Sequence, residues 1–190
     1  MTAAEAMPVP EESKEQPLAV RVGAELVGSF FICFAIYTIC TLDAIVSNLN
    51  MAFIALMTGA AYAVMTLVFG KISGGQFNPA VSIAAMLTGK THVLDGILYI
   101  IAQLLGGIGA GAALRFLLPT SEQVPFKSWL SLAVNGFDKA SISYSTLSSL
   151  GLSFGITLAV VVELIAGLII VATAMRGMGE RGASNTKHAI

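Results

Sequence analysis

Long uncharged segments are the main feature of this amino-acid sequence. No charged residue lies between Asp43 and Lys71, and comparable runs follow Asp95 and Lys139. About 20 consecutive, mostly apolar residues are enough for an α-helix to cross a lipid bilayer. We therefore predict four membrane-spanning helices, over roughly residues 18–42, 51–70, 93–118 and 150–175.

Composition supports a membrane location. Hydrophobic residues make up 56% of the 190 residues and charged residues only 11%, whereas ordinary soluble domains carry about 25% charged residues. So few charges cannot cover a water-exposed surface, and the expected partner is the lipid bilayer. The net charge of −1 offers no basic surface for nucleic acid.

The flanking sequences predict three parts and an orientation. Residues 1–17 are acidic and proline-containing, which indicates a disordered cytoplasmic tail. Residues 18–178 are expected to form the transmembrane domain, and residues 179–190 a polar cytoplasmic segment. Cytoplasmic flanks are enriched in Lys and Arg. Both termini are therefore predicted in the cytoplasm, from the basic residues Lys14, Arg21, Lys71, Lys90, Arg176, Arg181 and Lys187.

The segment between Lys71 and Lys90 is uncharged inside but interrupted by glycine and proline. Asn78 followed by Pro79 is typical of a helix N-cap and first helical residue, and Gly89 is typical of a helix stop. The helix Pro79–Thr88 would be about 15 Å long, half of a bilayer core of about 30 Å. We predict a re-entrant segment that ends in a half-helix; an ordinary cytoplasmic loop with a short amphipathic helix is the alternative.

Such a segment would place polar groups inside the membrane. Irregular backbone at that depth is tolerated only beside protein or a water-filled cavity. The carbonyl groups of Gly74, Gly75 and Gln76 are expected to face that cavity as acceptors. The half-helix would direct its partial positive charge to the membrane centre, and the Asn78 amide would offer a donor to a solute.

Three sequence features together resemble the aquaporin and glycerol-facilitator family, the major intrinsic proteins. They are the stretch ISGGQFNPAV (residues 72–81), the stretch YIIAQLLG (residues 99–106), and the pair Glu25 and Glu163. The resemblance covers roughly residues 20–178. It implies an all-α channel fold of six spans and two half-helices, usually a homotetramer with one pore per subunit. It also implies passive flow of water or small neutral solutes such as glycerol.

The resemblance also assigns roles to individual residues. Asn78, Pro79 and Ala80 match the motif at the pore centre. Glu25 and Gln103 match polar residues that hold the re-entrant loop, and a buried carboxylate needs donors such as loop N–H groups. Glu163, in the fourth span, is expected to be a structural hydrogen-bond partner.

Two positions depart from the family pattern. Gln76 stands where histidine is common, so the backbone carbonyl role is kept and an imidazole role is lost. Thr58, 20 residues before Asn78, stands where the outer constriction commonly has Phe or Trp. A small side chain there predicts a wider constriction, unless the neighbouring Tyr62 fills the space.

Small residues within the spans suggest packing contacts. Gly107 and Gly111 form a G-x-x-x-G pair, which allows a close approach of helices; packing within one subunit is preferred over a dimer interface. Cys33 and Cys40 lie about 10.5 Å apart along one helix, too far for a disulfide with each other, and are expected to be packing residues.

The length limits what the sequence predicts. Asn78 follows Glu25 by 53 residues, so the same offset from Glu163 places a second re-entrant loop near position 216. We therefore expect four spans and one half-helix, the N-terminal two-thirds of the family fold. The predicted function is a channel for water or small neutral solutes; the alternative is a truncated, non-conducting subunit that packs with full-length relatives. His92 and His188 lie in flanking segments, so neither an enzyme nor a metal or other cofactor is expected.

Overall fold

The computed structural model of the chain describes residues 15–45, 51–133, 136–141, 144–153 and 155–186. Most of the predicted N-terminal tail therefore lies outside the described residues. Four long helices dominate: α1 (Leu18–Ile45), α2 (Met51–Ser73), α4 (Val93–Leu117) and α7 (Ile156–Thr186). Each contains a stretch long and apolar enough to cross a membrane. The fold class predicted from the sequence is confirmed.

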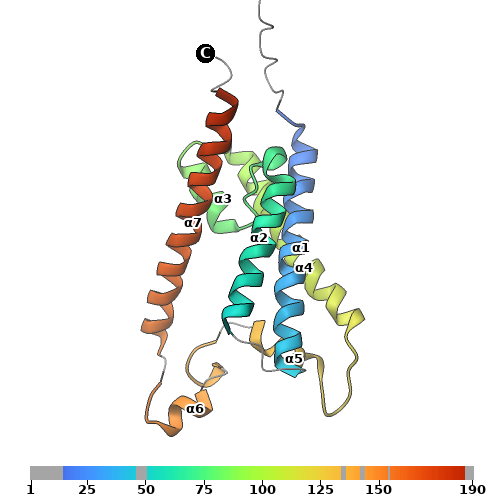
Figure 1. Cartoon of the computed structure of the whole chain (residues 1–190), viewed down its shortest axis with the longest axis vertical. Coiled ribbons are helices and arrows are strands. Elements are labelled where there is room, and N and C mark those ends of the chain that lie inside the picture. Colours follow the sequence, from blue (N-terminus) through green and yellow to red (C-terminus); the bar gives the residue numbers. More distant parts are fainter. Residues whose placement is uncertain (1–14, 46–50, 134–135, 142–143, 154, 187–190) are drawn as a thin grey trace, which may run out of the picture.

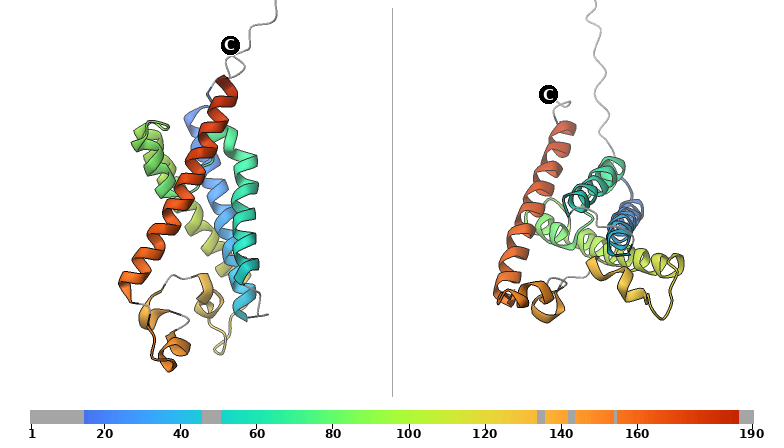
Figure 2. Two further views of the ribbon diagram at one scale, coloured as in Figure 1. Left: turned by 60° about the vertical axis from the view of Figure 1, so that its left-hand side comes forward. Right: turned by 60° about the horizontal axis from the view of Figure 1, so that its bottom comes forward.

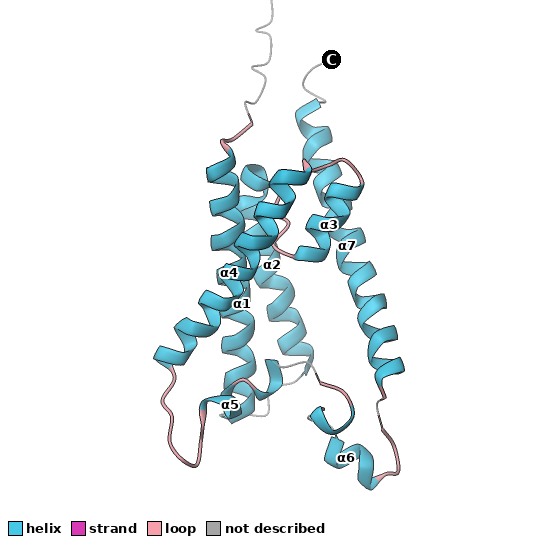
Figure 3. Cartoon of the chain, turned by 180° about the vertical axis from the view of Figure 1, so that it is seen from behind, coloured by secondary structure: helices cyan, strands magenta, loops and turns pink. Residues whose placement is uncertain are grey.

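The remaining elements are short. Helix α3 (Pro79–Leu87) follows α2, and the connection between α4 and α7 contains four further elements. Figures 1 and 3 show α3 beside α7, at the end of the bundle where the chain leaves α7. The four elements of the connection lie at the opposite end: α5 (Phe126–Trp129), η1 (Ser131–Ala133), η2 (Asp138–Ala140) and α6 (Tyr144–Ser149).

The packed core lies mainly between α1 and α4. These two helices have the most extensive contact, followed by α1 with α2. A β-carbon placed on Gly106 of α4 would lie 2.5 Å from the carbonyl oxygen of Leu26 and 2.9 Å from the amide nitrogen of Phe30. The absence of a side chain at Gly106 therefore allows the two backbones to touch.

Residues of the predicted G-x-x-x-G pair also face α1. A β-carbon on Gly107 would lie 3.5 Å from Cys33 Sγ, and one on Gly111 would lie 3.9 Å from Tyr37. This placement supports packing within one chain, the preferred interpretation. Cys33 and Cys40 are both free, with Cys40 buried and Cys33 half-buried.

The predicted start of the fourth span was wrong, whereas its apolar stretch ends at Met178, close to the predicted end. Helix α7 begins at Ile156 rather than Leu150, because α6 ends in a turn in which Gly151 has φ +71° and Leu152 N–H donates to Leu147 O. Helix α7 also continues to Thr186, into the predicted polar segment of residues 179–190. Charged residues end an apolar stretch without ending a helix, because Arg and Glu have good helix propensity.

Helices α2 and α7 leave much apolar surface uncovered. None of the most apolar window of either helix is buried within the described chain. Figure 2 shows α7 standing at the side of the bundle, with α3 as its neighbour. These two helices therefore present apolar faces that can accept lipid or further protein.

Candidate functional site

The segment between Lys71 and Lys90, which contains α3, enters and leaves at the same end of the bundle. At its start, a β-carbon on Gly74 would lie 3.7 Å from Met178 Sδ of α7. At its far end, Lys90 Nζ donates to Met175 O of the same helix at 2.7 Å. Met175 and Met178 lie within one turn of α7, so Gly74 and Lys90 contact the same part of that helix. The chain from Gly74 to Lys90 therefore makes a re-entrant excursion. This is the path predicted from the glycine and proline positions.

Glu25 of α1 is the anchor of this excursion. Its side chain is fully buried and accepts hydrogen bonds from three groups of the segment. Ser73 Oγ donates at 2.6 Å and Gln76 N at 2.9 Å, both to Oε1, while Phe77 N donates to Oε2 at 2.7 Å. These bonds give the buried carboxyl oxygens of Glu25 the hydrogen-bond partners that buried polar groups need.

Gln103 of α4 joins the same network from the other side. Its Nε2 donates to Glu25 Oε2 at 2.8 Å and to Ser82 Oγ at 2.9 Å. Ser82 lies on α3, so Gln103 connects α1 and α4 to the half-helix. The loop-holding role that the resemblance implies for Glu25 and Gln103 stays a prediction.

Backbone conformation explains why this stretch is rich in glycine. Gly74 and Gly75 have φ of +93° and +66°, a region that other residues avoid. Phe77 also has a positive φ, of +48°, and its ring lies against Gly28 of α1, where a β-carbon would come within 2.2 Å of it. The positive φ of Phe77 costs free energy on its own. It is held by the Gly28–Phe77 contact and by the two hydrogen bonds that Gln76 N and Phe77 N donate to Glu25.

Asn78 caps the half-helix as the sequence predicts. It has extended backbone, with φ −150°, and its Oδ1 accepts from Ala80 N at 2.9 Å, with Pro79 as the first helical residue. The Tyr62 side chain of α2 lies near the Asn78 side chain and interacts with it. The helix ends at Leu87 with Thr88 as C-cap, one residue earlier than predicted. Helix α3 packs mainly against α4 and α7, while the loop that precedes it contacts Gly28 of α1 and lies near Thr66 of α2.

The other predicted site residues have different surroundings. Gln76 is buried, and its Nε2 donates to Thr91 Oγ1 at 2.6 Å, so its side chain faces the turn after α3. Thr58 is half-buried on α2, one helical turn from Tyr62. The orientation of the Gly74, Gly75 and Gln76 carbonyl groups toward a cavity stays a prediction.

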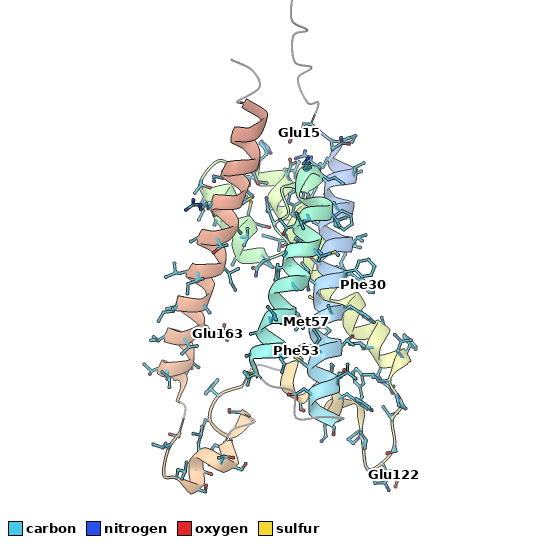
Figure 4. The ribbon with its side chains drawn as sticks, in the orientation of Figure 1. Glu15, Phe30, Phe53, Met57, Glu122 and Glu163 are labelled. Atoms are coloured by element: carbon cyan, nitrogen blue, oxygen red, sulfur yellow. The ribbon has the colours of Figure 1, made fainter. Side chains whose placement is uncertain are left out.

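Glu163 is not enclosed as Glu25 is. It lies on an exposed part of α7 and projects toward the rest of the bundle (Figure 4). Together with Gly167 it borders a shallow apolar groove between α7 and α3, to which Ala80 and Ala84 contribute. Its structural role stays a prediction.

Sequence reasoning missed several residues of the network. Ser73, Ser82, Gly28 and Thr91 contact the segment. A usable signal existed for Ser82, a hydroxyl inside an otherwise apolar half-helix. Gly28 lies about one turn from Glu25, so it also shares a helix face with a predicted site residue.

Among the described residues, no group of three or more metal-ligating side chains gathers in one place. The polar groups of the segment are hydrogen-bond donors and acceptors held by a carboxylate and amides. The chemistry available to these groups is hydrogen bonding.

Comparison with known proteins places the chain in a family. The family model described as Major intrinsic protein matches residues 12–187. Aquaporin Z of Photorhabdus laumondii is 35% identical over 132 residues, covering 68% of this chain and 56% of that protein. Aquaporin-B of Dictyostelium discoideum is 30% identical over 152 residues, covering 77% and 51%. Nodulin-26 of Glycine max is 35% identical over 102 residues, covering 53% and 38%.

The chain thus spans about half the length of the curated relatives it matches. The match confirms the predicted resemblance, and the apolar helices make the chain a multi-pass membrane protein. Members of this family are channels, so the prediction that the chain is not an enzyme is confirmed as well. With nearly its whole described length matched, this chain belongs to the major intrinsic protein family.

Proposed function

We propose that this chain forms part of a passive membrane channel for water and small neutral solutes such as glycerol. One observation carries the proposal: α3 is a half-helix capped by Asn78, and the loop that leads to this cap is held by the buried Glu25. A helix N-terminus carries a partial positive charge, which repels cations and leaves neutral molecules free to pass.

Individual residues take the roles expected from the sequence. Asn78 donates a hydrogen bond to the passing molecule, while Pro79 and Ala80 shape the end of α3. The carbonyl groups of Gly74, Gly75 and Gln76, the residues that lead to Asn78, serve as a row of acceptors. A chain of acceptors ending in a donor allows a molecule to exchange its hydrogen bonds with water for equivalent bonds to the protein.

Thr58 is proposed to leave the outer constriction wide. It lies on α2 one turn from Tyr62, whose side chain interacts with Asn78. That interaction keeps Tyr62 near the end of α3, which argues against Tyr62 filling the place of a missing aromatic at Thr58. A wide constriction favours solutes larger than water.

Both termini of the described chain lie at one end of the bundle (Figure 1), and we propose that this end is cytoplasmic. Glu15 and Glu122 mark the two opposite ends (Figure 4). Lys71 and Lys90 flank the re-entrant segment at the terminal end, which suits the enrichment of basic residues on the cytoplasmic side. Protease treatment of membrane vesicles tests this orientation. We expect cleavage of the N-terminal segment only in inside-out vesicles. We also propose assembly as a homotetramer, on the basis of family membership.

Osmotic shrinkage of proteoliposomes tests the channel. The sample is protein that contains this chain and the remaining length of the family fold. Stopped-flow light scattering measures shrinkage of the liposomes with impermeant sugar and with glycerol. We expect permeability well above that of empty liposomes. Thr58→Phe is expected to reduce glycerol permeation more than water permeation, because the larger side chain narrows the pathway. Permeability equal to empty liposomes contradicts the proposed function, and unchanged glycerol permeation removes Thr58 from the constriction.

The uncovered apolar faces of α2 and α7 favour a second candidate. In it, a chain of only these residues is a non-conducting subunit that packs its exposed faces against longer relatives. The same assay on the purified 190-residue chain separates the two: no permeability is expected, because one half-helix provides only one half of the pore centre. Water permeability that an Asn78 substitution abolishes would contradict the second candidate.

A further inference from the structure

The turn that follows α3 is attached to three parts of the chain. Gly89 has φ +71° and turns the backbone, so that Lys90 N and Thr91 N both donate to Ala85 O, at 2.9 and 3.2 Å. These bonds fix the turn against the last turn of the half-helix. The side chains of Lys90 and Thr91 are then free to reach neighbouring elements.

Thr91 reaches back to the start of the re-entrant segment. Its Oγ1 accepts from Gln76 Nε2 at 2.6 Å, although the two residues stand on opposite sides of α3 in the sequence. Gln76 is only 2% exposed, and its Oε1 is buried without a partner in the described part of the chain. Among the described residues, the bond to Thr91 is therefore what orients this amide.

Gln76 is bound at two points by different elements. Its backbone N–H donates to Glu25 of α1, and its side chain is bound to the turn after α3. The half-helix thus lies in a loop whose two ends are tied together by the Gln76–Thr91 bond. On the outer side, Lys90 Nζ ties the same turn to Met175 O of α7.

We propose that Thr91 is a positioning residue for the pore-centre motif: by holding Gln76 it closes the base of the re-entrant loop and fixes the depth of Asn78. Without the Thr91 hydroxyl, the Gln76 amide would be buried with neither of its polar ends bonded. Buried polar groups in that state destabilise their surroundings. The strain would be relieved by movement of residues 76–78, and the N-terminal end of α3 would move with them.

Hydrogen–deuterium exchange of the 190-residue chain in detergent micelles tests this proposal without requiring conduction. The readout is the exchange rate of peptides that cover residues 79–87. Thr91→Val, which keeps the shape and removes the hydroxyl, should speed exchange by roughly 3- to 10-fold, the effect of one lost hydrogen bond. Thr91→Ser should keep the exchange rate of the unaltered chain, because the hydroxyl is retained.

Thr88→Val is the matched control. Thr88 lies in the same turn and is exposed. Within the described chain, its hydroxyl bonds only to carbonyl groups of α3, Ala84 O and Ala85 O. Its exchange rates should stay within about twofold of the unaltered chain. Equal acceleration by Thr88→Val and Thr91→Val, or none by Thr91→Val, would overturn the proposal.

The double substitution of Gln76→Met with Thr91→Val separates a specific bond from two independent effects. Because each single change already removes the bond, the double variant should exchange no faster than the faster single variant. Multiplied effects would contradict the pairing.

A permeation arm rests on the proposed function. In proteoliposomes of the longer protein, Thr91→Val should lower water permeability and Thr91→Ser should restore it. Unaltered protein that does not conduct would count against the channel function alone, since the exchange experiment still decides the role of Thr91. Normal conduction by Thr91→Val, with conducting unaltered protein, would count against the positioning role.

Discussion

Glu25→Ala is expected to abolish stable folding of the chain or to lower its stability by about 4 kcal/mol or more. The substitution leaves Ser73 Oγ, Gln76 N, Phe77 N and a Gln103 Nε2 proton without their acceptor. Each buried donor left unpaired costs about 1–3 kcal/mol. The free energy of unfolding of a protein is about 5–15 kcal/mol, so this loss is a large part of the total stability. Thermal unfolding in detergent, followed by size-exclusion chromatography with fluorescence detection, measures it.

Two further variants make the interpretation specific. Glu15→Ala removes another carboxylate near the same end of α1, but its side chain is 79% exposed and, among the described residues, is paired only with Arg21. It should change stability by less than about 1 kcal/mol. Glu25→Gln keeps the shape and one acceptor oxygen but turns an NH₂ group toward donors, so an intermediate loss is expected. Equal stability of Glu25→Ala and Glu15→Ala would show that the network does not anchor the segment.

The sequence predicted the elements whose signals are local. Uncharged runs located α1, α2 and α4 to within a few residues, because the length of an apolar segment is itself the physical requirement for spanning a membrane. The signal for the half-helix was equally local, because Asn78 and Pro79 favour the start of a helix and Gly89 favours its end. The start of α7 was missed because hydropathy continues through residues 150–155, where only the turn at Gly151 separates two helices.

The contacts of the candidate site depended on tertiary structure. Glu25 and Glu163 begin similar apolar runs, yet Glu25 is fully buried among donors and Glu163 is exposed. The difference arises from the segment that surrounds Glu25, which lies about 50 residues later in the chain. Family resemblance supplied that pairing, whereas Ser73 and Thr91 had no signal in the sequence because hydroxyl groups are common at helix ends and turns.

Gly106→Val is expected to separate α1 from α4 and to produce the second largest loss of stability. The added β-carbon would lie 2.5 Å from Leu26 O and 2.9 Å from Phe30 N. Both are backbone atoms of a helix, which cannot rotate away as a side chain can. Inserted carbon atoms in a packed core cost about 1–3 kcal/mol, and occasionally more. The same unfolding measurement in detergent is suitable.

Separation of α1 from α4 should also loosen the re-entrant segment. Gln103 lies about one turn before Gly106 on α4, and its Nε2 bonds to Glu25 and Ser82 require the close approach of α1 and α4. Gly106→Val should therefore speed hydrogen exchange in α3, which the substituted residue does not itself belong to. The effect is expected to be smaller than that of Glu25→Ala, because the bonds from Ser73, Gln76 and Phe77 do not depend on α4.

Neighbouring glycines provide the controls for Gly106. A β-carbon on Gly107 would lie 3.5 Å from Cys33 Sγ, an ordinary contact, and one on Gly23 would meet nothing within 4 Å. Gly23→Ala should leave stability unchanged or raise it by up to about 1 kcal/mol through better helix propensity. If Gly106→Val is as stable as Gly107→Ala, then α1 and α4 can move apart at little cost, and the Glu25 network rather than helix packing holds the half-helix in place.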